Sequence, residues 1–90
     1  MCLGIPGEVI EIVDADEHLA KVEVSGVQRV ISAKLLADEG VTAGDWVLVH
    51  VGFAMSKIDE SEATMTLDQI KRLGTAYDEE MEAFMETEIV

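Results

Sequence analysis

Turn signals divide the first two-thirds of this 90-residue chain into short segments with the pattern of β-strands. Residues 19–24 alternate between apolar and charged side chains, and Ser25-Gly26 then marks a tight turn into a returning strand. Residues 33–42 read as a looser connection with room for one helical turn. The pattern predicts strands at residues 8–13, 19–24, 27–31, 46–51 and 53–58.

A helix is expected after the last strand. Asp59 and Glu62 have the spacing of a capping box, with Asp in place of the usual Ser or Thr. One helical face then carries apolar side chains, and Gly74 is a typical C-terminal stop. The apolar positions are Ala63, Leu67, Ile70 and Leu73.

Five short strands followed by a helix predict a mainly β fold, a small OB-like five-stranded β-barrel with one or two C-terminal α-helices. Closing the sheet removes the exposed edges that five strands would otherwise present. We expect residues 1–58 to form the barrel with an N-terminal cysteine-bearing arm. Residues 59–74 then form a packing helix, and residues 75–90 form an acidic tail with the spacing of a short helix.

The charge excludes several classes of partner. The chain has 6 Lys and Arg against 19 Asp and Glu, a formal net charge of −13. Binding to nucleic acid or to an anionic membrane needs clustered basic residues, so neither partner is expected. Six of the acids, and no base, fall in residues 75–90, where they are most simply a solvated face.

Cys2 is the single cysteine, so no disulfide can form within the chain, and a reducing cytoplasm is expected. A terminal thiolate is a nucleophile or a soft-metal ligand, although an incidental exposed cysteine is an equal alternative. Pro6-Gly7 reads either as a rigid turn that supports an arm carrying Cys2 or as an ordinary entry into the first strand.

His50 closes an apolar strand next to Gly52. From the residues themselves, a hydrogen-bonded core histidine is favoured over a ligand at a strand end. One cysteine and two histidines cannot supply the three or four ligands of a closed soft-metal site. The sequence therefore predicts no closed metal site of this kind.

Two blocks resemble a known family. Met1-Cys2-Leu3-Gly4-Ile5-Pro6-Gly7 is similar to the start of the HypC/HupF family of [NiFe]-hydrogenase maturation chaperones, and residues 44–54 resemble its second signature. The resemblance covers roughly residues 1–73 and leaves out the acidic tail. It implies an OB-like barrel that is not an enzyme. It further implies two partners, the scaffold protein HypD and the immature hydrogenase large subunit.

The resemblance also implies the site. The family's N-terminal cysteine falls on Cys2, as the contact with both partners and an iron ligand, and its signature histidine falls on His50. The iron would carry cyanide and carbon monoxide, would be held transiently and shared with a partner, and no cofactor would be permanently bound. Ser25 stands where some members have a second cysteine. The residues expected to contact partners are Cys2, Leu3, Pro6, Gly7, Gly52 and Phe53.

The leading hypothesis is therefore a cytoplasmic metallochaperone that receives this iron group from the scaffold and delivers it to the large-subunit precursor. Two alternatives stay open. One is a purely structural adaptor that uses its acidic helices as a contact surface. The other is an enzyme with Cys2 as a nucleophile activated by its own α-amine.

Overall fold

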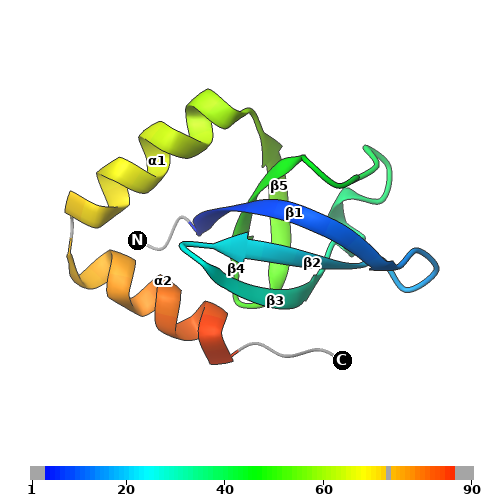
Figure 1. Cartoon of the computed structure of the whole chain (residues 1–90), viewed down its shortest axis with the longest axis horizontal. Coiled ribbons are helices and arrows are strands. Elements are labelled where there is room, and N and C mark those ends of the chain that lie inside the picture. Colours follow the sequence, from blue (N-terminus) through cyan, green and yellow to red (C-terminus); the bar gives the residue numbers. More distant parts are fainter. Residues whose placement is uncertain (1–3, 73, 87–90) are drawn as a thin grey trace.

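The protein is a five-stranded barrel followed by two helices (Figure 1). The structure, a computed structural model, describes residues 4–72 and 74–86. A single 3₁₀ turn, η1, connects β3 to the loop before β4. The elements are β1 (Ile5–Asp14), β2 (Leu19–Val24), β3 (Val27–Ser32), η1 (Lys34–Leu36), β4 (Trp46–His50), β5 (Phe53–Ile58), α1 (Glu60–Arg72) and α2 (Thr75–Glu86).

The strands close in the order β1-β2-β3-β5-β4, and β4 pairs back with β1. All pairs are antiparallel except β3 and β5, which meet in parallel at Ser32 and Phe53. The expectation of a small OB-like barrel with C-terminal helices is confirmed. The barrel is closed by one short parallel contact between two antiparallel hairpins.

The core is built by alternation along the strands. Inward positions of β2 carry Ala20, Val22 and Val24, which are all buried, while Lys21 and Glu23 face outward. In β4, Val47 and Val49 are fully buried. Trp46, Leu48 and His50 lie on the other face of β4 and are half-buried, and both helices contact this strand. The apolar character of both faces of β4 therefore reflects a barrel interior on one side and helices on the other.

Pro6 and Gly7 lie within β1 and not in a turn before it, because β1 begins at Ile5. They pair with Leu48 and Val47 of β4, whereas pairing of β1 with β2 begins at Glu8. Proline is tolerated here since only one side of the strand is paired at this point. A Cβ atom on Gly7 would lie 2.4 Å from Cγ1 of Val22, so glycine is required by close packing inside the barrel.

The helix α1 begins as the capping box predicts. The backbone N–H of Glu62 donates to Oδ1 of Asp59 over 2.7 Å, and the helix ends before Gly74, which has a φ of +63°. Both α1 and α2 contact β1 and β4, on the side of the barrel where β1 begins (Figure 1). Neither helix is long and apolar enough to cross a bilayer, within the part of the chain that the structure describes.

Candidate functional site

The site begins where the end of β4 meets the start of β1. Ile5 pairs with Val49, which places Gly4 and Ile5 next to His50. Gly4 has a φ of +88°, and a Cβ atom there would lie 3.0 Å from the carbonyl oxygen of Val49 and 3.6 Å from Cβ of His50. The two blocks that carry the family resemblance, whose nearest members Gly7 and Gly44 are 37 residues apart, thus contribute to neighbouring strands, β1 and β4.

The turn after His50 is tight and strained. Val51 and Gly52 have φ values of +49° and +83°, the pattern of a type I′ hairpin turn. A β-branched residue is a genuine outlier at positive φ, and Val51 is also 60% exposed. The carbonyl oxygen of Gly52 accepts a 2.9 Å hydrogen bond from the N–H of Ser32, which ties this turn to β3. The turn therefore holds an apolar side chain out beside His50.

The structure brings together some of the predicted site residues. His50, Gly52 and Phe53 form one hairpin end, where Phe53 is 45% exposed. Pro6 and Gly7 are buried in β1, so any effect they have on a partner must act through the barrel. Cys2 and Leu3 lie outside the described residues.

His50 is not a core residue. Its side chain is 36% exposed, and Nδ1 lies 3.3 Å from Oε2 and 3.4 Å from Oε1 of Glu80. Glu80 comes from α2 and is 5% exposed. Desolvation by burial raises the pKa of the Glu80 carboxyl. The alternative of a buried structural histidine is therefore wrong, and His50 lies at the surface with a buried carboxyl beside it.

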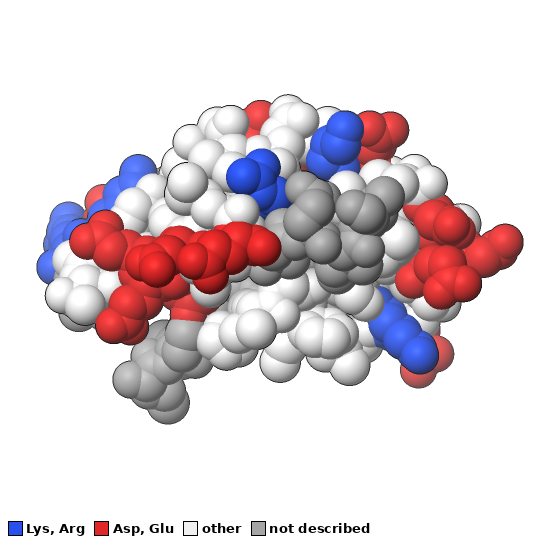
Figure 2. All heavy atoms as spheres, turned by 90° about the horizontal axis from the view of Figure 1, so that it is seen from below, with Lys and Arg blue, Asp and Glu red and all other residues white. Residues whose placement is uncertain are grey.

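The interpretation of the tail acids as a solvated face is wrong for Glu80. Figure 2 shows acidic side chains gathered in a row across the surface of α2, but Glu80 lies on the opposite, buried side. The sequence spacing already indicates that Glu80 is buried. Tyr77, Glu80 and Phe84 recur at i, i+3 and i+7, so a carboxyl sits within the apolar stripe of the helix.

Three further contacts hold α2 against the barrel. Phe84 is 2% exposed and packs in the core cluster. Tyr77 Oη lies 2.9 Å from Oγ of Ser25. Arg29 Nε donates to the backbone carbonyl of Met85 over 2.9 Å. The acidic tail thus contributes a docked helix to the surroundings of His50.

The donor set near His50 is incomplete for a resident metal. Within residues 4–72 and 74–86, no group of three or more His, Cys, Asp or Glu side chains could hold a metal ion. An imidazole with one carboxyl falls short of a closed tetrahedral or octahedral set. A metal at His50 would need donors other than the described residues.

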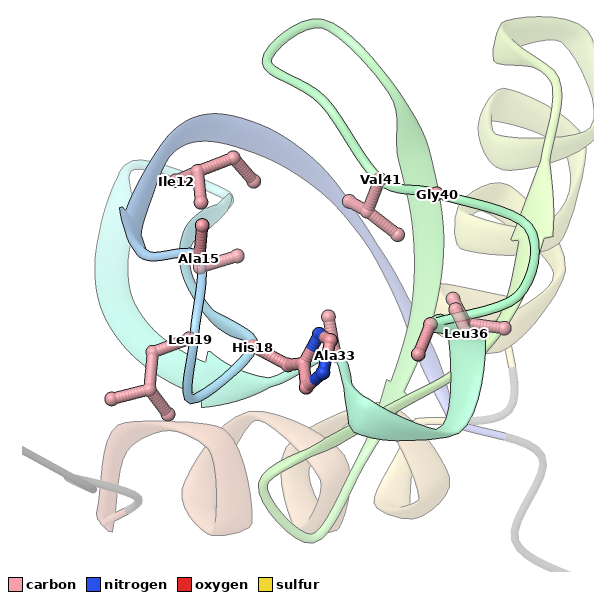
Figure 3. A pocket seen from close by; sticks show the side chains of 10 residues that line it. Ile12, Ala15, His18, Leu19, Ala33, Leu36, Gly40 and Val41 are labelled. Atoms are coloured by element: carbon pink, nitrogen blue, oxygen red, sulfur yellow. The ribbon is translucent and has the colours of Figure 1, made fainter.

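An apolar recess of about 180 Å³ lies between the β1–β2 connection and η1 (Figure 3). None of the described predicted site residues lines it. His18 is half-buried, lines this recess and has a φ of +57°. The other lining residues are Ile12, Ala15, Leu19, Ala20, Ala33, Leu36, Ala37, Gly40 and Val41.

Comparison with known proteins gives concordant matches. The model of the HupF/HypC family matches residues 1–70. The chain is 47% identical to the hydrogenase maturation factor HypC of Rhodobacter capsulatus, over 84% of this chain and 81% of that protein. It is 49% identical to the hydrogenase maturation factor HybG of Escherichia coli, over 81% of this chain and 92% of that protein. HypC of Escherichia coli is 47% identical, over 81% of this chain and 82% of that protein.

Proposed function

This chain belongs to the HupF/HypC family, and from that premise we propose that it is a hydrogenase maturation factor that carries iron to the immature large subunit of a [NiFe]-hydrogenase. It acts as a chaperone and not as an enzyme. The matches to maturation factors extend over more than four-fifths of the chain, which supports a role for the whole barrel.

The observation that carries the proposal is the position of Gly4 and Ile5 beside His50. Gly4 packs against the end of β4, and Cys2 is two residues earlier in the chain. Two residues span at most about 7 Å, so the chain length allows Cys2 to approach His50. A thiolate and an imidazole are suitable donors for iron with strong-field ligands.

The cargo is iron that carries cyanide and carbon monoxide. A carrier has to release its cargo, and a site with too few donors of its own favours release to a molecule that completes the coordination. The incomplete donor set around His50 supports this transient, shared binding. No permanently bound cofactor is part of the proposal.

The proposed partners are a HypD-type scaffold protein, from which the iron group is taken, and the large-subunit precursor, to which it is delivered. Exposed Phe53 and Val51 at the hairpin end give such partners an apolar contact next to His50. We place the exchange in the cytoplasm, where a lone cysteine stays reduced.

Co-purification tests the partner roles. Tagged wild-type chain and the variants Cys2→Ala and His50→Asn are expressed in a host that contains the scaffold and the precursor. We expect Cys2→Ala to lose both complexes. His18→Asn, a change of the other histidine, serves as the matched control and should retain them. Undiminished complexes with Cys2→Ala would overturn the assigned role of Cys2.

Infrared spectroscopy tests the cargo. The chain isolated anaerobically from such a host should show metal-bound cyanide and carbonyl bands, and Cys2→Ala should lose them. Complexes that form without these bands would favour a structural adaptor. Mass spectrometry of the active protein addresses the enzyme alternative, because activation by the Cys2 α-amine requires that Met1 has been removed.

A further inference from the structure

Glu80 is a carboxyl on the buried face of a helix, a position that needs a physical reason. It lies between Tyr77 and Phe84 on the side of α2 that packs against the barrel, and only 5% of its surface is exposed. Burying a carboxyl is costly unless it is hydrogen-bonded. Among the described residues, no buried side-chain polar atom lacks a partner. The partner of Glu80 is therefore informative.

That partner is His50, and the carboxyl lies beside Nδ1 of its ring. Both carboxyl oxygens of Glu80 lie 3.3–3.4 Å from Nδ1 of His50. A neutral imidazole carries a proton on one nitrogen and a lone pair on the other. A carboxylate that accepts the N–H of Nδ1 leaves the lone pair on Nε2. Metal-binding histidines are commonly oriented in this way by a carboxylate on their second nitrogen.

We propose that Glu80 is a positioning residue for His50, which fixes the Nδ1–H tautomer and the ring orientation so that Nε2 is the nitrogen offered to the iron. This inference rests on the proposed function of His50 as a ligand. Glu80 lies beyond residues 1–70, the range that the family model matches. The C-terminal helix of this chain thus takes part in the site by holding the histidine in place.

A purely structural role for Glu80 predicts different behaviour. If Glu80 only fastened α2 to the barrel, replacing it by leucine would be tolerated or even stabilising, since an apolar side chain suits the stripe between Tyr77 and Phe84. Hydrogenase maturation would then be unchanged. A positioning role predicts that the tautomer changes and maturation falls while the fold is retained.

The test is the tautomer of His50, measured by long-range ¹H–¹⁵N correlation spectra of the full chain labelled with ¹⁵N-histidine. The spectra are recorded near pH 8.5, about two units above the usual histidine pKa. His50→Asn identifies the His50 signals against those of His18. The wild type is expected to show the Nδ1–H form.

Three variants separate the explanations. Glu80→Gln keeps an oxygen acceptor of the same reach and should retain the Nδ1–H form. Glu80→Leu should shift His50 toward the Nε2–H form, which free imidazole side chains prefer in water. Glu79→Leu, a change at the exposed neighbouring acid, is the matched control and should leave the tautomer unchanged. A wild-type Nε2–H form, or a tautomer insensitive to Glu80→Leu, overturns the inference.

The same variants distinguish failure of this inference from failure of the proposed function. In a host that lacks the factor, Glu80→Leu should lower hydrogenase maturation by about 10- to 100-fold, and Glu80→Gln should largely restore it. If Glu80→Leu changes the tautomer but His50→Asn matures hydrogenase normally, the proposed ligand role of His50 is wrong while the contact stands. If His50→Asn abolishes maturation but Glu80→Leu leaves the tautomer of His50 unchanged, the positioning role is wrong.

Discussion

The hydroxyl of Tyr77 lies 2.9 Å from the hydroxyl of Ser25 and joins α2 to the turn between β2 and β3. Tyr77→Phe removes this hydrogen bond but keeps the ring, over which the ammonium of Lys71 lies 5.7 Å from the centroid. We expect the free energy of unfolding to fall by about 0.5–1.5 kcal/mol, measured by urea denaturation. Ser25→Ala should cost a similar amount. The double variant should lose little more free energy of unfolding than either single variant. If the two single losses instead added in full, the hydroxyls would not be coupled.

Phe84 anchors α2 in the core. Phe84→Ala removes a side chain that is 2% exposed, and we expect a loss of about 3–5 kcal/mol in the free energy of unfolding. Met85→Ala is the matched control, since Met85 is 49% exposed and its backbone carbonyl, which accepts from Arg29, is unchanged. Calorimetry and amide hydrogen exchange in α2 provide the measurement. Equal small losses for both variants would contradict the docked position of the helix.

Gly7 is required by packing inside the barrel. A Cβ atom there would lie 2.4 Å from Val22 and 2.9 Å from Val24, so Gly7→Ala should lower the free energy of unfolding by about 1–3 kcal/mol. Combining it with Val22→Ala makes room for the added methyl group. The double variant should then be more stable than the sum of the single losses predicts. Normal stability of Gly7→Ala with weakened partner binding would instead indicate a direct partner contact.

Much of the fold is readable from the sequence because local signals agree with the final structure. Gly26 and Gly52 close hairpins where the strand pattern breaks, and Asp59 caps the helix where apolar spacing changes. The place of Pro6 is not evident from local sequence, since a proline normally ends or precedes a strand, and it lies inside β1 because β1 is paired on only one side there.

Most of the site depends on contacts between distant segments. The pairing of Ile5 with Val49, which places Gly4 and Ile5 beside His50, follows from barrel closure and not from any local pattern. Glu80 has the composition of a solvated acid, and only its place in the apolar stripe of α2 marks it as buried. The partner of a polar side chain is set by tertiary packing, which local propensity does not encode.

Val51 stores backbone strain at the hairpin end. Asparagine adopts positive φ more readily than valine, so Val51→Asn should raise the free energy of unfolding by about 1 kcal/mol. The same substitution at Val13, which is 42% exposed in the extended backbone of β1, is the matched control and should be neutral or destabilising. A loss at both positions would show that the gain from relieving strain is smaller than the cost of removing valine.

The ionisation of Asp45 makes the stability of the fold depend on pH. Hydrogen bonding from the backbone N–H of Thr42, 2.9 Å from Oδ2, and from Lys57, 3.4 Å away, outweighs desolvation and lowers the pKa of Asp45 below its ordinary value of 3.8. A lowered carboxyl pKa stabilises the fold above that ordinary value, and the contribution is lost as the pH falls through the folded pKa. Asp45→Asn should therefore make the free energy of unfolding fall less steeply as the pH is lowered.

Lys57→Met provides the comparison for Asp45. It removes the second favourable partner and leaves the Thr42 hydrogen bond, so the steepness of its fall should lie between those of the wild type and Asp45→Asn. Urea denaturation between about pH 2 and pH 6 supplies the curves. An Asp45→Asn curve parallel to that of the wild type would remove Asp45 as a source of the pH dependence.

The contacts of α2 join residues that are far apart in the sequence, and this separation determines the order in which the elements fold. The hairpins close between residues three positions apart, such as Val24 with Val27 and His50 with Phe53. In contrast, α2 reaches back 52 residues to Ser25 and 56 residues to Arg29. Long loops are entropically costly to close, so the helix is expected to dock after the hairpins have formed. Substitutions on α2 should then speed unfolding more than they slow folding, and the carboxyl beside His50 arrives late in folding.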